Sequence, residues 1–167
     1  NGVGAVVLGP PEGGESLAAD RAGDAFRAAD IETTVAADMP RRLWTKLAVN
    51  AGINPVTALA RVDNGAVLTE PLAGVARGAA RETGEVATAA GVDLDPGEAV
   101  AAMEGVARET ADNVSSMRQD VEAGRRTELD AINGYVVQQA TDPVPVNRTL
   151  AGLVSGWEAG KTGPDRA

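Results

Sequence analysis

Three polar residues are spaced four positions apart within an apolar segment of the chain. Lys46, Asn50 and Asn54 stand among residues 43–55, where most other side chains are apolar. In an α-helix this spacing brings the three polar side chains to one face, and the apolar residues around them indicate a buried helix. Burying such groups costs about 1–3 kcal/mol each unless they find partners, so the stripe is a candidate site. The alternative is that Lys46 extends to solvent and the asparagines are ordinary polar residues near a helix end.

The chain contains no cysteine and no histidine. These absences exclude a disulfide scaffold, a cysteine-based zinc site, a cysteine nucleophile and a Ser-His-Asp triad. Proton transfer would therefore fall to Lys, Asp, Glu, Tyr or water, and we expect no metal site.

A second polar segment contains the starts of two expected helices. Asn113 is an N-cap candidate with Ser116 at the third helical position, and Thr127-x-x-Asp130 is a variant of the capping box. Glu128 would then lie in a first turn, where a carboxylate interacts favourably with the helix dipole. Nothing in this local pattern requires a catalytic role for it.

The composition bounds the fold class and the partners. The 167 residues carry a net charge of −9, and very few of the apolar residues are aromatic. An Ala-rich, aromatic-poor chain favours closely packed helices, and a negative surface repels nucleic acid and anionic membranes. No apolar run reaches transmembrane length, so we expect a cytoplasmic protein without nucleic-acid or membrane partners. Because the chain starts without Met, we also expect it to be a piece of a longer protein.

The first forty residues predict a strand–helix–strand unit. Residues 4–8 and 31–36 have the pattern of short strands, and residues 15–29 have the pattern of a helix between them. One such βαβ unit leaves sheet edges unpaired and is not stable as a sheet by itself.

From Asp38 onward the pattern is helical. Asp38 can cap a helix over residues 40–53, and Pro55 is expected to stop or kink it, because the residue before a proline avoids the α region. A short apolar segment (56–62) and a turn at residues 63–65 should follow. The remaining expected helices span residues 71–90, 96–109, 113–123, 128–141 and 146–159.

Two long motifs in these segments resemble one family. Residues 44–58 read Trp-x-Lys-x-x-x-Asn-x-x-x-Asn-Pro-Val-Thr-Ala, and an Asn-Gly pair follows at Asn64. Residues 115–120 read Ser-Ser-Met-x-Gln-Asp, and residues 127–134 read Thr-Glu-Leu-Asp-x-x-Asn-Gly. Both motifs, in this order and at this separation, are similar to those of the ketopantoate reductases. The resemblance covers nearly the whole chain.

The resemblance implies a mainly α fold. It places a helical domain, like the C-terminal domain of 6-phosphogluconate dehydrogenase, at residues 38–167, and a βαβ remnant of an NADP-binding Rossmann domain at residues 1–37. Gly2-x-Gly4 lacks the third glycine and the helix of a dinucleotide fingerprint, and the family's phosphate loop is absent. We therefore expect NADPH to be bound mainly by a domain outside this chain, and the chain alone to be inactive.

The resemblance also implies an activity, the NADPH-dependent reduction of ketopantoate to pantoate on the route to coenzyme A. It implies that Lys46 is the proton donor and that Glu128 lies near Lys46 and the cofactor. The residues that it implies bind the substrate are Asn50, Asn54, Asn64 and Ser116. An ammonium beside the ketone oxygen would stabilise the charge left by hydride transfer and then donate the proton. The hydride itself would come from the cofactor.

Two alternatives remain open at this stage. A related reductase of the same architecture could act on another 2-keto acid, because the motifs define the keto-acid chemistry better than the rest of the substrate. The chain could instead be a non-catalytic helical module that self-associates as a homodimer through its Ala-rich helices.

Overall fold

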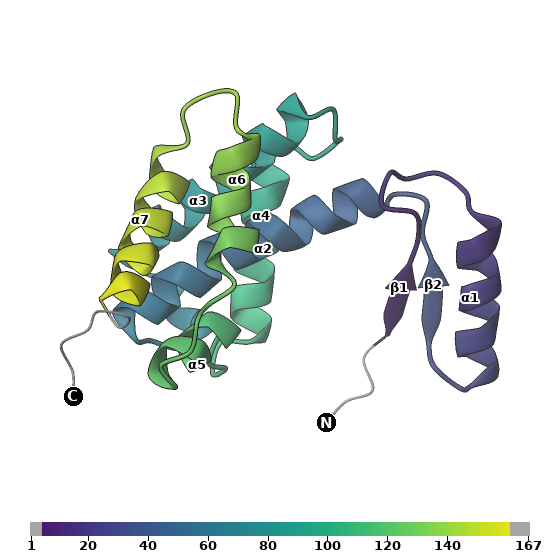
Figure 1. Ribbon diagram of the computed structural model, residues 1–167, viewed down its shortest axis with the longest axis horizontal. Helices are drawn as coiled ribbons and strands as arrows, with labels where there is room; N and C mark the ends of the chain where they lie inside the picture. The colour runs from purple at the N-terminus through teal and green to yellow at the C-terminus, as the bar shows by residue number, and fades with distance from the viewer. Residues whose placement is uncertain (1–4, 161–167) are drawn as a thin grey trace. The chain divides into compact units, whose positions relative to one another are not determined.

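The computed structural model describes residues 5–160 (Figure 1). The chain divides into two compact units, and the division falls between Leu43 and Trp44. Helix α2 (Met39–Ala60) contributes residues to both units. Each unit is described separately below.

The first unit is a small βαβ arrangement. Strands β1 (Val6–Leu8) and β2 (Thr33–Val35) pair in parallel, with Val7 opposite Thr34. Helix α1 (Leu17–Ala28) lies beside them in Figure 1, and the Ser16 hydroxyl caps it by accepting from the Ala19 backbone N–H at 3.4 Å. The predicted strand–helix–strand order is confirmed, although both strands are shorter than expected.

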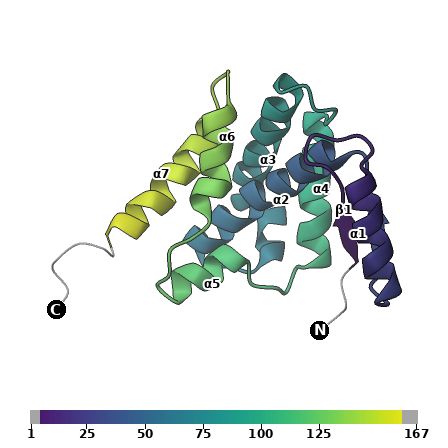
Figure 2. The same ribbon diagram turned by 45° about the vertical axis from the view of Figure 1, so that its right-hand side comes forward.

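The second unit is helical, which confirms the predicted mainly α fold. Besides most of α2, its described residues up to 160 form two 3₁₀ helices, η1 and η2, and five α-helices. Their bounds are η1 Asn64–Leu68, α3 Leu72–Ala89, α4 Pro96–Glu109, α5 Ser116–Glu122, η2 Leu129–Ala131, α6 Asn133–Gln139 and α7 Pro145–Ala159. Helix α3 packs against α4, and α6 packs against α7 (Figure 2).

The second half of α2 lies at the centre of this unit. Every residue from Ala51 to Ala58 is buried, as expected for a helix that is enclosed on all sides. Small residues allow the neighbouring helices to approach closely: a Cβ added at Gly52 would lie 2.9 Å from the Ala76 carbonyl oxygen of α3. The Ala-rich composition therefore has a packing role here.

The helix does not stop at Pro55, which was one of the two predicted outcomes, because α2 continues to Ala60. Pro55 has no N–H, so the carbonyl of Ala51, four residues earlier, loses its helical donor. The Nδ2 group of Asn133 donates to that carbonyl at 3.2 Å instead. A residue 82 positions away thus satisfies the polar group that the proline leaves free.

Two further expectations about helix starts are corrected. The N-cap of α5 is Ser115, whose hydroxyl accepts from the Arg118 N–H at 3.2 Å, and not Asn113. The expected helix over residues 128–141 is divided into η2 and α6 at Ile132, which has the non-helical dihedral angles φ −109° and ψ −98°. By contrast, α4 spans the predicted residues 96–109 and has a complete capping box on Asp95.

Candidate functional site

The polar stripe of the sequence lies along one continuous helix. Lys46, Asn50 and Asn54 all belong to α2, so their spacing of four brings them to the same face. Lys46 is exposed, Asn50 is half-buried and Asn54 is only 7% exposed. The stripe therefore runs from solvent into the interior of the helical unit, with the cation at its outer end.

Asn64, at the start of η1, is fixed by the segment that precedes α5. Its backbone N–H donates to the Asn113 carbonyl at 3.0 Å, and its Nδ2 donates to the Thr110 hydroxyl at 3.0 Å. The side-chain oxygen of Asn64 is buried and accepts no hydrogen bond within the described structure. A buried acceptor without a donor destabilises the fold, and a donor group of a bound ligand could supply the missing hydrogen bond.

A pair of hydroxyl groups joins α5 to α2 beside these residues. The Thr57 and Ser115 side-chain oxygens are 2.7 Å apart and buried, and the Thr57 hydroxyl also lies within hydrogen-bond distance of the Ile53 and Asn54 carbonyls, at 2.9 and 3.1 Å. Ser116 follows directly as the first residue of α5, and it is exposed. The segments that carry Asn54 and Ser116 are thus connected through one buried contact.

Ion pairs of Arg118 connect α5 to the residue before η1. Arg118 pairs with Asp63, the residue before Asn64, at 2.6 Å and with Glu122 at 2.7 Å. The hydrogen bond to Glu122, and then that to Asp63, raises the pKa of the Arg118 guanidinium above its ordinary value. The positions of Asn64 and Ser116 relative to each other are therefore set by charged as well as neutral hydrogen bonds.

Four of the six candidate residues are next in the chain to members of one apolar cluster. Leu47, Ala51, Met117 and Leu129 all belong to this cluster. Each follows directly after a candidate residue, and those candidates are Lys46, Asn50, Ser116 and Glu128. Because Lys46, Ser116 and Glu128 are exposed and Asn50 is half-buried, these four residues lie at the border between that cluster and solvent.

The segment before Glu128 is held by α7 and not by the predicted capping box. Thr127 donates its backbone N–H and its hydroxyl to Glu158 at 2.7 and 2.8 Å. Asp130 instead pairs with Arg126 at 2.7 Å, and the Glu128 side chain makes no capping hydrogen bond. Glu128 is thus an exposed carboxylate on a segment whose backbone is fixed.

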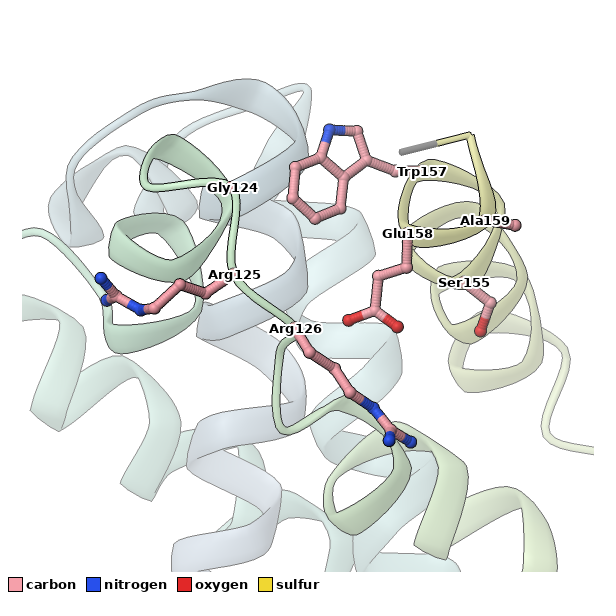
Figure 3. A pocket seen from close by; sticks show the side chains of 7 residues that line it. All are labelled: Gly124, Arg125, Arg126, Ser155, Trp157, Glu158 and Ala159. Atoms are coloured by element: carbon pink, nitrogen blue, oxygen red, sulfur yellow. The ribbon is translucent and has the colours of Figure 1, made fainter. Parts of the chain in front are cut away.

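A cavity of about 400 Å³ lies between the end of α7 and the loop before Thr127. Its lining residues are Gly124, Arg125, Arg126, Ser155, Trp157, Glu158 and Ala159. Figure 3 shows Trp157 and Glu158 projecting from α7 toward this loop. None of the six candidate residues lines it, and both arginines are already paired, Arg125 with Asp120 and Arg126 with Asp130. The cavity is thus separate from the candidate site.

Sequence reasoning missed three residues that support the site, namely Thr57, Ser115 and Asn133. All three lie inside the two motifs, and each is at most 5% exposed. The sequence marked each of them only as a polar residue among apolar neighbours. Their partners could not be predicted, because Thr57 and Ser115 are 58 positions apart and Asn133 is 82 positions from Ala51. Within residues 5–160, no group of three or more Asp or Glu side chains is placed to hold a metal ion, and no helix is long and apolar enough to cross a membrane.

Comparisons with known proteins identify the family of the chain. A sequence model of the family described as "Ketopantoate reductase PanE/ApbA C terminal" matches residues 38–158. The chain is 40% identical to a 2-dehydropantoate 2-reductase of Archaeoglobus fulgidus over 163 residues, which are 95% of this chain and 54% of that protein. It is 43% identical to the one of Halobacterium salinarum over 157 residues, 92% of this chain and 52% of that protein.

Solved structures show the same fold. A PanE/ApbA family ketopantoate reductase from Ralstonia eutropha superposes with a TM-score of 0.83 at 28% identity, over 96% of this chain and 54% of that one. A probable 2-dehydropantoate 2-reductase from Bacillus subtilis superposes with a TM-score of 0.81 at 31% identity, over 94% of this chain and 54% of that one. The chain spans about half the length of the relatives that it matches. It belongs to the ketopantoate reductase family and comprises the family's helical C-terminal domain.

Proposed function

We propose that this chain forms the substrate-binding half of an NADPH-dependent 2-dehydropantoate 2-reductase, which reduces ketopantoate to pantoate. The observation that carries the proposal is the connection of the α2 stripe to Ser116 through the Thr57–Ser115 contact, together with the hydrogen bond of Asn64 to Asn113 in the segment before Ser116. One cation and several amide and hydroxyl groups suit a small hydroxy acid, which needs orientation without much added charge. The names of the relatives support the same reaction.

In this proposal each candidate residue has a separate task. Lys46, at the exposed end of the stripe, stabilises the negative charge that develops on the ketone oxygen and donates the proton. Asn50 and Asn54 hold the polar groups of the substrate, and Ser116 binds its carboxylate. The unpaired side-chain oxygen of Asn64 accepts a hydrogen bond from a substrate hydroxyl. Glu128 lies near Lys46 and the cofactor.

The nicotinamide cofactor supplies the hydride when it is bound. The described residues fit only part of its binding site, since the chain has no glycine-rich phosphate loop before a helix. We propose that NADPH is bound mainly by the part of the relatives' length that this chain does not match. Residues 1–37 would then be the end of that nucleotide-binding domain, and residues 38–167 the substrate domain.

The setting of the protein is also proposed. The net charge of −9 supports a cytoplasmic enzyme that binds neither nucleic acid nor membranes. The Ala-rich helical unit would allow a homodimer, which a light-scattering mass would test. A dimer without catalysis in the test below would favour the non-catalytic alternative.

The test replaces the matching segment of the A. fulgidus enzyme, to which the chain is 40% identical, with this chain. The chimera should oxidise NADPH only when ketopantoate is present. Comparison with simpler 2-keto acids defines the substrate, and equal rates on all of them would reject the specific assignment. A chimera that binds NADPH but reduces no keto acid would contradict the proposal.

Substitutions at Lys46 then separate its two roles. Lys46→Met should lower kcat by about 10²–10⁴-fold. Lys46→Arg keeps the positive charge but cannot release a proton at neutral pH, so it should recover only a small part of the lost rate. Arg108→Met, which removes an exposed cation on α4, is the matched control and should leave kcat unchanged. If Lys46→Met reduced ketopantoate at the unaltered rate, the proton donor would be another group.

A further inference from the structure

A chain of buried polar groups connects the middle of α2 to the start of α7. The Asn133 Nδ2 donates to the Ala51 carbonyl at 3.2 Å and to the Asn147 side-chain oxygen at 2.9 Å. Asn133 and Asn147 are both 0% exposed. Buried amides of this kind are retained only where their hydrogen bonds are specific, because an unpaired one is costly.

The partners of Asn147 determine the orientation of both amides. The Asn147 Nδ2 donates to the Ala79 carbonyl at 3.0 Å and to the Glu82 carboxylate at 2.8 Å, and both of these groups are acceptors. The side-chain oxygen of Asn147 must therefore face Asn133, which in turn must present its NH₂ group. The Ala51 carbonyl can also only accept, so it requires the same orientation of Asn133 and the Asn133–Ala51 bond does not depend on Asn147.

The carbonyl that Asn133 binds lies within the candidate site's own helix. Ala51 follows Asn50 directly and precedes Asn54 by three residues. In the turn between the two asparagines, the backbone bond that would normally hold this carbonyl is missing because of Pro55. The path of α2 between Asn50 and Asn54 therefore depends on a donor from another helix.

We propose that Asn133 is a positioning residue for the substrate. It replaces the missing helical donor at Ala51 and thereby fixes how the Asn50 and Asn54 amides are directed relative to each other. The substrate role of those two amides is the proposed function above, on which this inference depends. Pro55 and Asn133 act as a pair, in which the proline releases the carbonyl and the amide holds it in place.

The test uses three substitutions, in the A. fulgidus chimera and in this chain. Asn133→Ala removes the donor to Ala51. Pro55→Ala supplies a backbone N–H that can bind the same carbonyl, so it should rescue Asn133→Ala. Asn147→Ala is the matched control, because it deletes a buried amide of the same network but leaves the Asn133–Ala51 bond in place.

In the chimera, Asn133→Ala should raise KM for ketopantoate about tenfold, with kcat and the KM for NADPH changed less than about twofold. Adding Pro55→Ala should reverse most of that rise in KM. Asn147→Ala should lower Tm at least as much and leave KM within about twofold. If KM rose equally in Asn147→Ala, or if Pro55→Ala did not lower the KM of Asn133→Ala, Asn133 would have a purely structural role.

A second measurement does not depend on activity. In ¹⁵N-labelled chain, Asn133→Ala should shift the side-chain amide resonances of Asn50 and Asn54, Pro55→Ala should restore them, and Asn147→Ala should leave them in place. If the unaltered chimera reduces no keto acid, the proposed function fails while these spectra still decide whether Asn133 directs the two amides. Unshifted resonances in Asn133→Ala would overturn the inference in either case.

Discussion

The hydroxyl groups of Thr57 and Ser115 are hydrogen-bonded at 2.7 Å, although 58 residues separate them in the chain. Thr57 lies one turn after Asn54 on α2, and Ser115 immediately precedes Ser116 on α5. Both hydroxyl groups are buried, so water cannot readily replace either partner. This contact therefore sets the distance between two candidate substrate-binding residues on different helices.

Replacing Thr57 with Val should remove this contact while keeping the side-chain shape. The Ser115 hydroxyl would lose its buried partner, so we expect the free energy of unfolding to fall by about 1–3 kcal/mol. Urea denaturation of the helical unit, followed by circular dichroism, measures this loss.

Thr83→Val is the matched control for that substitution. Thr83 is also 0% exposed, but its hydroxyl donates to the Ala79 carbonyl in its own helix at 2.8 Å. That carbonyl is also the acceptor for Asn147, so it keeps a side-chain partner after the change. The loss in Thr83→Val should be clearly smaller, and equal losses would show that the contact between helices adds nothing.

Local signals predicted the parts of the fold that local chemistry decides. The predicted helix over residues 96–109 is α4, and the patterns of two short strands with a helix between them indicated the βαβ order. Lys46, Asn50 and Asn54 were found from their regular spacing in an apolar pattern, whereas Asn64, Ser116 and Glu128 were implied only by the resemblance to the family. Their assignment to roles stays a prediction.

Long-range contacts decided the parts that were not predicted. Where α2 continues beyond Pro55, Asn133 binds the Ala51 carbonyl, and no residue near the proline indicates that partner. Asn113 and Ser115 are both plausible caps locally, but Ser115 also reaches Thr57 on another helix. Thr127 and Asp130 have the spacing of a capping box, yet Glu158 and Arg126 bind them instead. Asn133, Thr57 and Glu158 are distant partners that local patterns do not reveal, whereas Arg126 is a local competitor for Asp130.

Glu82 should be a major contributor to stability at the start of α7. Its two carboxylate oxygens accept from the backbone N–H groups of Val146 and Asn147, each at 2.8 Å, and the side chain is 7% exposed. Glu82→Gln removes a negative charge from a helix N-terminus and turns an NH₂ group toward N–H donors. We expect thermal or urea unfolding to report a loss of about 1.5–3 kcal/mol.

Glu85→Gln tests whether that loss is specific to the buried carboxylate. Glu85 lies three residues later on the same helix and is exposed. Its replacement should change stability by less than about 0.5 kcal/mol. A comparable loss in both variants would indicate a general charge effect.

The contact between α3 and α4 should make stability depend on pH in the acid range. The hydrogen bond from Arg77 to Glu104, at 2.6 Å, holds the pKa of the Glu104 carboxyl below its ordinary value of 4.5. The unfolded chain then binds the proton at higher pH than the folded chain does. The stabilisation is therefore complete above pH 4.5 and is lost as the pH falls through the lower, folded-state pKa.

Glu104→Gln should remove that part of the acid sensitivity. Urea midpoints measured between about pH 6 and pH 3 should fall less steeply in this variant below the ordinary carboxyl range. Glu109→Gln, an exposed position on the same helix, should keep the steeper profile. Identical profiles in Glu104→Gln and the unaltered chain would assign the acid sensitivity to other carboxylates.

Two adjacent serines should separate stability from substrate binding. Ser115 is 5% exposed, caps α5 and contacts Thr57, so Ser115→Ala should lower the free energy of unfolding by about 1–2 kcal/mol. Ser116 is exposed and Ser116→Ala should change it by less than about 0.5 kcal/mol. In the A. fulgidus chimera, Ser116→Ala should raise KM for ketopantoate about tenfold by removing the proposed contact to the carboxylate. Because the two hydroxyl groups belong to neighbouring residues, a variant pair with the opposite pattern would show that Ser115 faces the substrate and that Ser116 is the structural residue.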